Sequence, residues 1–256
     1  MKIKLFILIF SFSICKIFAT AQTPDKIIID EKQFDLLNNP LEQFFKIHPE
    51  LDPIYGGKIK MFNKYRNKPI PIPFSTGNYR GYIATFKIEN NFLKLFDIKI
   101  QNIESEKREY ISVYKELFGD KQISLNYNGI LIIPTGDFLD SANFGYSYLF
   151  SKYQLMTIKN DNIERSKEVT KDEYLKFKVI QFVEYKKTAD YQNEVKEYFE
   201  NWKTEKEIEL SRKNTKNLTK REIAELHKEY INAPKSEFID NFLFVTKNLD
   251  FVIVDY

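Results

Sequence analysis

The sequence predicts an α+β fold: a mainly antiparallel sheet with a C-terminal helical hairpin and terminal strands that rejoin the sheet. Three observations predict it. Residues 80–100 alternate apolar and polar side chains on both sides of an Asn-Asn pair, which is typical of a β-hairpin. Residues 189–231 carry apolar side chains at helical spacing instead. Residues 238–256 are again largely apolar, so we expect them to return to the sheet.

The first part of the chain predicts short strands and one helical turn. We expect a strand at 27–29, a helical turn at 40–45 and a strand at 58–62 after Gly56-Gly57. Residues 67–73 alternate proline with other residues. Because proline fixes φ and lacks an amide donor, this stretch predicts an extended segment at a sheet edge or crossing.

The middle of the chain predicts a meander of strands interrupted by one helix. Residues 109–118 place apolar side chains at helical spacing ahead of Gly119, a residue favoured in a left-handed helix cap. Short strands are expected within 121–134 and 144–158, and Asn160-Asp161 predicts a second hairpin turn.

Two capping boxes mark helices in the second half of the chain. Thr170 with Glu173, and Thr219 with Glu222, have the spacing at which each side chain bonds the backbone N–H of the other. We expect a helix over 171–187. A strand is the alternative there, because apolar residues are dense in this segment. Further helices are expected over about 189–211 and after residue 219.

The domain organisation follows from these elements. Residues 203–220 are mostly charged or polar and predict a mobile tip of the helical hairpin. Because the terminal strands are expected to rejoin the sheet, residues 22–256 are predicted to form a single α+β domain.

Residues 1–21 have the layout of a secretory signal peptide. Lysines come first, an apolar run follows, and Ala19-Thr20-Ala21 forms a small-x-small cleavage site before Gln22. The run is too short for the roughly 20 apolar residues of a membrane span. The sequence therefore predicts an exported protein, periplasmic or extracellular, with no stable membrane span after cleavage. Lipid attachment through Cys15 is the alternative, although Ile14 precedes the cysteine where a small residue is usual.

Cleavage changes the chemistry that is open to the protein. The full chain holds 39 basic and 36 acidic residues, and three of the lysines but no acid lie in residues 1–21. The remaining 36 of each sign give a net charge of zero, which removes the support for nucleic-acid binding. Cys15 is the only cysteine, so the cleaved chain has no thiol nucleophile, disulfide or cysteine-ligated metal.

A segment within residues 75–140 resembles a group of uncharacterised bacterial secreted proteins. The resemblance rests on Arg80-Gly81-Tyr82-Ile83-Ala84-Thr85-Phe86-Lys87-Ile88, on the return strand to Ile98, and on the apolar strand 129–134 before Gly136. It implies a hairpin at these residues and carries no activity with it. Tyr79 and Phe86 depart from the pattern, since tryptophan is expected at both positions.

The candidate ligand-binding residues are Arg66, Tyr79, Arg80 and Asp137. Arg80 begins a strand beside a glycine, and its guanidinium can pair with a carboxylate ligand or with Asp137 on a later loop. The alternative is a purely structural Arg–Asp pair. His48 lies in a loop with acidic neighbours, and His227 lies in a helix; neither belongs to a second ligand cluster, so we predict no metal site and no cofactor.

These observations leave three interpretations of function. The first is an exported, non-enzymatic binding or interaction protein of the bacterial envelope, with an envelope protein or a small molecule as its ligand. The second is a hydrolase that uses carboxylates near Asp137, such as Asp140. The third is a protein that binds its partner through the helical hairpin 189–231. Recognisable catalytic motifs are absent from the sequence, which favours the first.

Overall fold

The computed structural model of the protein describes residues 22–63, 77–105, 107, 109–141, 148–212, 219–231 and 234–256. The predicted signal peptide with Cys15, the candidate Arg66 and the proline-dense segment 67–73 lie outside these residues. Where the sequence predicts one domain, the described residues form two compact units. The first comprises the chain up to Lys178 together with Asp250–Tyr256, and the second comprises Val179–Leu249.

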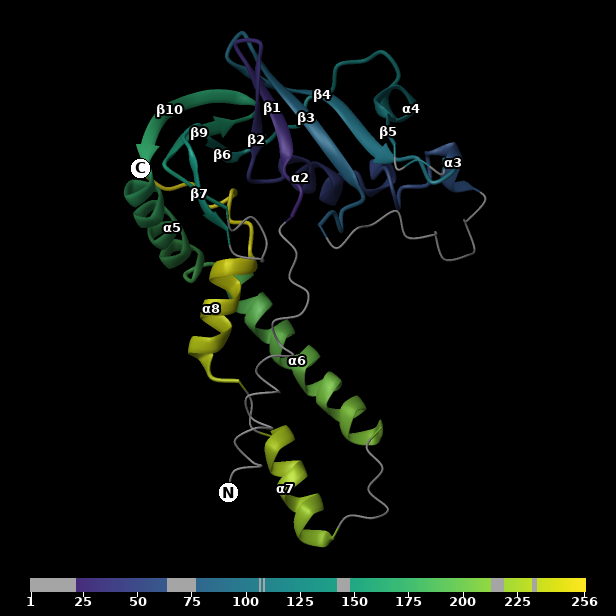
Figure 1. Ribbon diagram of the computed structural model, residues 1–256, viewed down its shortest axis with the longest axis vertical. Helices are drawn as coiled ribbons and strands as arrows, with labels where there is room; N and C mark the ends of the chain where they lie inside the picture. Colours follow the sequence, from purple (N-terminus) through teal and green to yellow (C-terminus); the bar gives the residue numbers. More distant parts are fainter. Residues whose placement is uncertain are drawn as a thin grey trace. The chain divides into compact units, whose positions relative to one another are not determined.

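The first unit contains an eight-stranded, mainly antiparallel sheet in the order β2-β1-β3-β4-β10-β9-β6, with β5 paired to β4 (Figure 1). Its strands are β1 (Asp25–Ile29), β2 (Lys32–Leu36), β3 (Tyr82–Glu89), β4 (Phe92–Gln101), β5 (Tyr110–Ser112), β6 (Gly129–Pro134), β9 (Lys152–Lys159) and β10 (Asn162–Thr170). β1 and β3 form the parallel pair. The predicted α+β class with a mainly antiparallel sheet is confirmed.

Three two-residue turns connect the hairpins β1–β2, β3–β4 and β9–β10. Asp30-Glu31, Asn90-Asn91 and Asn160-Asp161 all have positive φ, between 47° and 66°. Paired positive φ angles match the right-handed twist of the flanking strands, and asparagine and aspartate tolerate them best. The predicted hairpins at Asn90-Asn91 and Asn160-Asp161 are therefore confirmed.

Both faces of the sheet are covered by apolar packing. In β6, Leu131 and Ile133 join one buried cluster, whereas Ile130 and Ile132 join the other. The first cluster includes Leu41, Phe44 and Phe45 of helix α2 (Pro40–Ile47). The second includes Tyr174 of helix α5 (Lys171–Tyr185), whose ring stacks on Tyr153 at 3.9 Å. This two-sided burial explains why β6 is an uninterrupted apolar run.

Three of the predicted elements in this unit are wrong in detail. The strand predicted at 58–62 gives way to helix α3 (Lys60–Asn63), because Phe62 N–H closes a turn onto Ile59 O. The helix predicted at 109–118 begins as strand β5, paired to β4, and becomes α4 (Tyr114–Phe118) only in its second half. Gly119 follows it with the positive φ of 67° that glycine permits, but its ψ of −140° is not that of the predicted left-handed cap. Of the strands predicted in 121–134, only β6 forms.

The remaining short elements complete the first unit. The helical turn predicted at 40–45 is α2, and a 3₁₀ turn, η1 (Pro49–Leu51), follows it. Strands β7 (Phe138–Ser141) and β8 (Tyr148–Phe150) pair with each other in a separate two-stranded sheet.

Helices make up the second unit and confirm the predicted helical segments. α5 settles the alternative left open at 171–187 in favour of a helix, although its first residues belong to the first unit. α6 (Ala189–Arg212) and α7 (Lys220–Ile231) follow. Both capping boxes form, with Glu173 bonding Thr170 N–H at 2.8 Å and Glu222 bonding Thr219 N–H at 2.8 Å.

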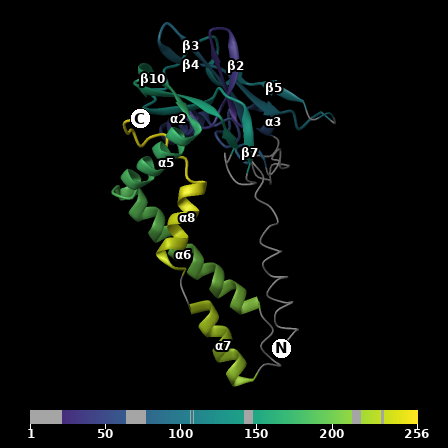
Figure 2. The ribbon, with the colours of Figure 1, turned by 60° about the vertical axis from the view of Figure 1, so that its left-hand side comes forward.

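The terminal strands predicted to rejoin the sheet are wrong. Residues 236–246 form helix α8 (Ser236–Thr246), which Figure 2 shows in yellow beside α6. The buried residues Ile239 and Leu243 are four apart, a helical rather than an alternating spacing. Residues 251–256 form no strand; Val254 and Tyr256 instead pack against the second apolar cluster. No helix in the described part of the chain is both long and apolar enough to cross a bilayer.

The predicted mobile tip at 203–220 is partly helical. Residues up to Arg212 continue α6, and α7 begins at Lys220. Residues 213–218 lie outside the described part of the chain.

Candidate functional site

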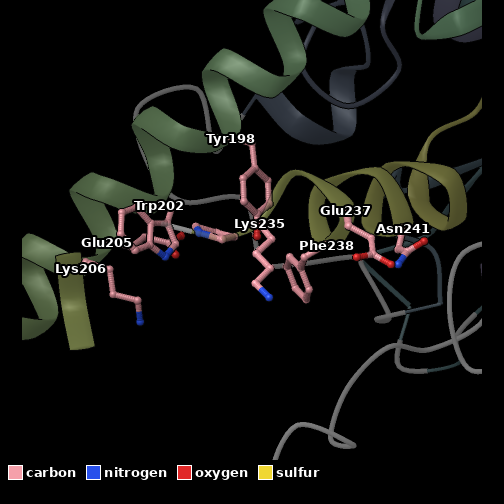
Figure 3. A pocket seen from close by; sticks show the side chains of 9 residues that line it. Tyr198, Trp202, Glu205, Lys206, Lys235, Glu237, Phe238 and Asn241 are labelled. Carbon is pink, nitrogen blue, oxygen red and sulfur yellow. The ribbon is translucent and has the colours of Figure 1, made fainter. Parts of the chain in front are cut away.

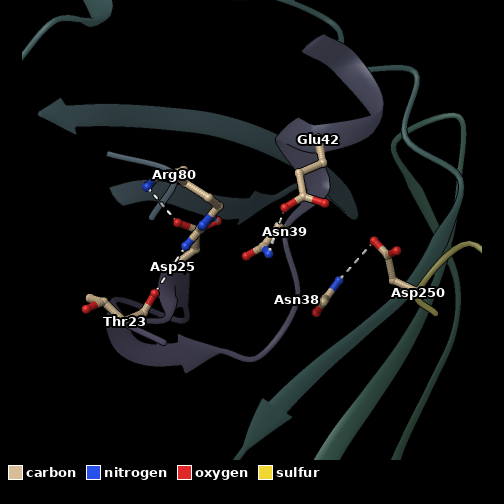
Figure 4. Close-up of polar contacts among 8 residues, drawn as sticks. Thr23, Asp25, Asn38, Asn39, Glu42, Arg80 and Asp250 are labelled. Carbon is tan, nitrogen blue, oxygen red and sulfur yellow. Dashed lines mark hydrogen bonds and ion pairs between the residues drawn. The ribbon is translucent and has the colours of Figure 1, made fainter. Parts of the chain in front are cut away.

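Arg80 lies buried in the first unit in an ion pair with Asp25. Its Nη1 donates to Asp25 Oδ2 at 2.8 Å, and its Nη2 donates to the Thr23 carbonyl at 3.1 Å (Figure 4). The other carboxylate oxygen of Asp25 accepts the N–H of Ala84 at 2.8 Å. Arg80 is 8 % exposed and Asp25 is fully buried. The pair therefore joins the start of β1 to the start of β3. This is the structural role that we considered as the alternative for Arg80, but its partner is Asp25 and not Asp137.

Burial dominates the electrostatics around this pair. Burial raises the pKa of the Asp25 carboxyl, and the Arg80 guanidinium and the Ala84 N–H oppose that rise. Burial also raises the pKa of Glu42, whose carboxylate accepts a hydrogen bond from Asn39 Nδ2 at 3.1 Å. The Arg80 guanidinium lies 5.1 Å from the centre of the Tyr82 ring, a cation–π distance.

Among the other predicted ligand-binding residues, Tyr79 lies near Arg80: burial raises the pKa of its hydroxyl, Glu42 adds to the rise and the Arg80 guanidinium opposes it. Tyr79 is next in sequence and 59 % exposed. Asp137 is exposed beside β7, where its backbone N–H donates to Ser151 Oγ at 2.8 Å. Asp140 is also exposed. Arg66 lies outside the described residues.

His48 belongs to no metal site among the described residues. His48 Nδ1 lies 3.6 Å from Glu50 Oε1, and its ring lies 4.8 Å from that of Phe44. The side chain of His227 lies outside the described part of the chain. Among the described residues no group of three metal-ligating side chains occurs.

A second buried polar cluster joins three distant parts of the first unit. Tyr127 Oη donates to Asp250 Oδ2 at 2.7 Å, and Asn38 Nδ2 donates to Tyr127 Oη at 3.1 Å. Asn38 Oδ1 accepts the N–H of Ile132 at 2.9 Å. Burial raises the pKa of Asp250 to about 6, although the hydrogen bonds from Tyr127 and Asn38 oppose the rise. Figure 4 shows Asn38 directed towards Asp250.

An open groove with an aromatic lining lies between helices α6 and α8 in the second unit. Tyr198 and Trp202 project from α6, and Phe238 projects from α8 (Figure 3). Glu205 and Lys206 of α6, with Lys235 and Glu237 at the start of α8, complete the charged lining. The volume of this pocket is about 660 Å³.

A smaller pocket of about 340 Å³ continues the same groove. It shares Tyr198, Trp202 and Glu205 with the larger pocket. Its other charged lining residues are Glu194 and Glu197, so its charged side chains are all acidic. Phe242 of α8 lines it as well.

Specific contacts hold α8 in place to form the groove. Asp240 of α8 accepts hydrogen bonds from Lys186 at 2.6 Å and from Tyr191 of α6 at 2.5 Å. Lys247, just after α8, pairs with Glu194 of α6. Asp240 and Lys247 thus attach α8 to α6. Phe238, Phe242 and Val245 remain exposed along α8.

The sequence predicts one of the two helices that form this groove. The predicted helix 189–211 includes Tyr198 and Trp202, which are four residues apart and therefore share one helix face. The α8 half was missed because residues 238–246 were predicted as a strand. The helical spacing of Phe238, Phe242 and Val245 is the signal that would have identified it.

Comparison with known proteins assigns no family to the chain. No protein-family model matches it, and neither the curated proteins nor the solved structures give a significant match. The resemblance of the β3–β4 hairpin to secreted bacterial proteins therefore stays a prediction.

Proposed function

We propose that this is an exported, non-enzymatic interaction protein of the bacterial envelope that binds a polypeptide partner through its helical unit. The observation that carries the proposal is the α6–α8 groove, in which large aromatic side chains are left accessible. Apolar surface that is exposed to water costs free energy in an isolated protein. An exposed apolar patch with charged residues around it is therefore typical of a binding surface. The export part of the proposal rests on residues 1–21.

The polar clusters of the first unit serve its folding in this proposal. The Arg80 guanidinium bonds Asp25 and Thr23, and the Asp250 carboxylate bonds Tyr127 and Asn38. Asp137, the residue considered for a hydrolase, is exposed. It lacks the burial that tunes a catalytic acid, so the structure gives the hydrolase alternative no specific support.

Site-specific photocrosslinking in producing cells tests the proposal. A photoreactive phenylalanine analogue replaces Phe238 in the groove or, as a matched control, Phe96 on β4. These side chains are 56 % and 58 % exposed, so we expect the two positions to give similar amounts of non-specific crosslinking. We expect a discrete protein adduct from position 238, reproduced with the purified partner, and none from position 96. Equal adducts from both positions, or none from position 238, would contradict the proposal.

A further inference from the structure

We propose that the α6–α8 groove binds a basic amphipathic helix, with apolar side chains in the larger pocket and a lysine or arginine in the smaller one. This inference rests on the proposed function and names the chemistry of the partner. It follows from the distribution of charge along the groove, from the aromatic side chains that both pockets share, and from the two-helix shape of the site.

The acidic end of the groove carries the charge argument. Glu197 and Glu205 line the smaller pocket, and neither forms an ion pair within the described residues. Glu194, the third carboxylate there, is already paired with Lys247. Glu205 lines the larger pocket as well, where Lys206, Lys235 and Glu237 are the other charged residues. The charged lining of the smaller pocket is thus entirely acidic, whereas that of the larger pocket has both signs.

Aromatic rings at the same place favour a cation further. Tyr198 and Trp202 are on the face of α6 that also carries Glu197, Asn201 and Glu205, because residues three and four apart share a helix face. A guanidinium or ammonium group beside these rings interacts with their negative π faces and, at the same time, with both carboxylates.

The shape of the groove favours a helix over a small ligand. The two pockets join along α6 and α8, and the exposed residues of α8 continue the apolar surface at i, i+4 and i+7 through Phe238, Phe242 and Val245. An amphipathic helix places its own apolar side chains at the same spacing when it lies in such a groove.

Fluorescence titration of the protein that begins at Gln22 tests the inference, because Trp202 is the only tryptophan in the chain. Two synthetic helical peptides without tryptophan share one apolar face and carry either lysine or glutamate on the polar face. We expect the lysine peptide to change Trp202 fluorescence with a Kd at least about tenfold lower than that of the glutamate peptide. Added salt should bring the two Kd values closer together, because the carboxylates of the groove are partly exposed and salt screens them.

Two variants locate the effect. Glu197→Gln combined with Glu205→Gln should weaken lysine-peptide binding about fivefold or more and leave Trp202 in place. Glu200→Gln is the control, because Glu200 is on the same helix, faces Lys196 at 3.9 Å and does not line the groove. Circular dichroism of each variant confirms that the helices are intact.

The outcomes separate this inference from the proposed function. Equal binding of both peptides, or no effect of the double substitution, overturns the basic partner and leaves the interaction proposal standing. Free trimethyllysine is titrated as a small cationic ligand. If it binds and neither peptide does, the proposal that a helix occupies the groove is overturned. If no ligand changes Trp202 fluorescence, the inference fails, and the crosslinking at position 238 decides the proposed function independently.

Discussion

At the scale of single residues, the buried charges of the first unit hold distant segments together. Arg80 and Asp25 are 55 positions apart, and Asp250 is 123 positions from Tyr127. The sequence singles out Arg80, because arginine is rare in this chain and the residue begins a strand. It does not identify Asp25, because pairing across such a separation is fixed by the parallel contact of β1 with β3.

Arg80→Ala should destabilise the protein strongly. The substitution leaves the Asp25 carboxylate buried without its counter-charge, which typically costs about 3–5 kcal/mol of unfolding free energy. Urea unfolding followed by circular dichroism measures the loss. Lys115→Ala is the control, since Lys115 pairs with Asp120 at an exposed site, where such pairs contribute at most about 1 kcal/mol. Similar losses in both variants would contradict the buried role.

Asp250 should make stability depend on pH. Its pKa is about 6 in the folded protein and 3.8 ordinarily, so folding favours the protonated form. Protonated Asp250 therefore adds about 3 kcal/mol to the free energy of unfolding below about pH 4, and this stabilisation is lost as the pH rises through 6. Asp250→Asn cannot ionise and should abolish this part of the dependence. Urea unfolding at several pH values checks it; an unchanged pH slope in the variant would count against a raised pKa.

At the scale of elements, turn and capping residues predict structure well, and short segments without them predict it poorly. The turn Asn90-Asn91 and both capping boxes are encoded by neighbouring residues, and all of them form. Residues 109–112 and 238–246 mix apolar and polar side chains in short segments whose pattern does not by itself separate a helix from a strand. The first pairs with the edge of β4, and the second packs Ile239 and Leu243 inward as a helix. Tertiary contacts decide both cases.

Thr170→Ala should weaken the start of α5. Thr170 Oγ1 accepts the N–H of Glu173, while the Glu173 carboxylate accepts the N–H of Thr170, and losing this cap costs about 1 kcal/mol. Thr204→Ala is the control, because Thr204 lies inside α6 and bonds only the Glu200 carbonyl. Alanine there should be neutral or slightly stabilising. Urea unfolding of both variants distinguishes a cap from general helix propensity.

At the scale of the whole molecule, the fold class could be predicted from the sequence, whereas the groove between α6 and α8 could not. The α+β class follows from periodicity, which is local. The groove requires α6 and α8 to meet, and Trp202 and Phe238 are separated by a segment whose length and composition do not specify their contact. Its discovery therefore depends on structure.

Export should leave a protein without a thiol. Cleavage before Gln22 removes Cys15, the only cysteine, together with the three lysines that make the full chain basic. Protein recovered from the envelope fraction, denatured and treated with a maleimide reagent, should show no mass increase, and N-terminal sequencing should begin at Gln22. One maleimide per chain would show that residues 1–21 are retained.

Hydrogen exchange of the backbone amides, with and without saturating lysine-faced peptide, tests the central claim most directly. The claim is that the helical unit binds a polypeptide in the α6–α8 groove. We expect slower exchange in α6 and α8 around Trp202 and Phe238, with no change in the β3–β4 hairpin. Protection confined to the sheet of the first unit, with α6 and α8 unchanged, would contradict the account.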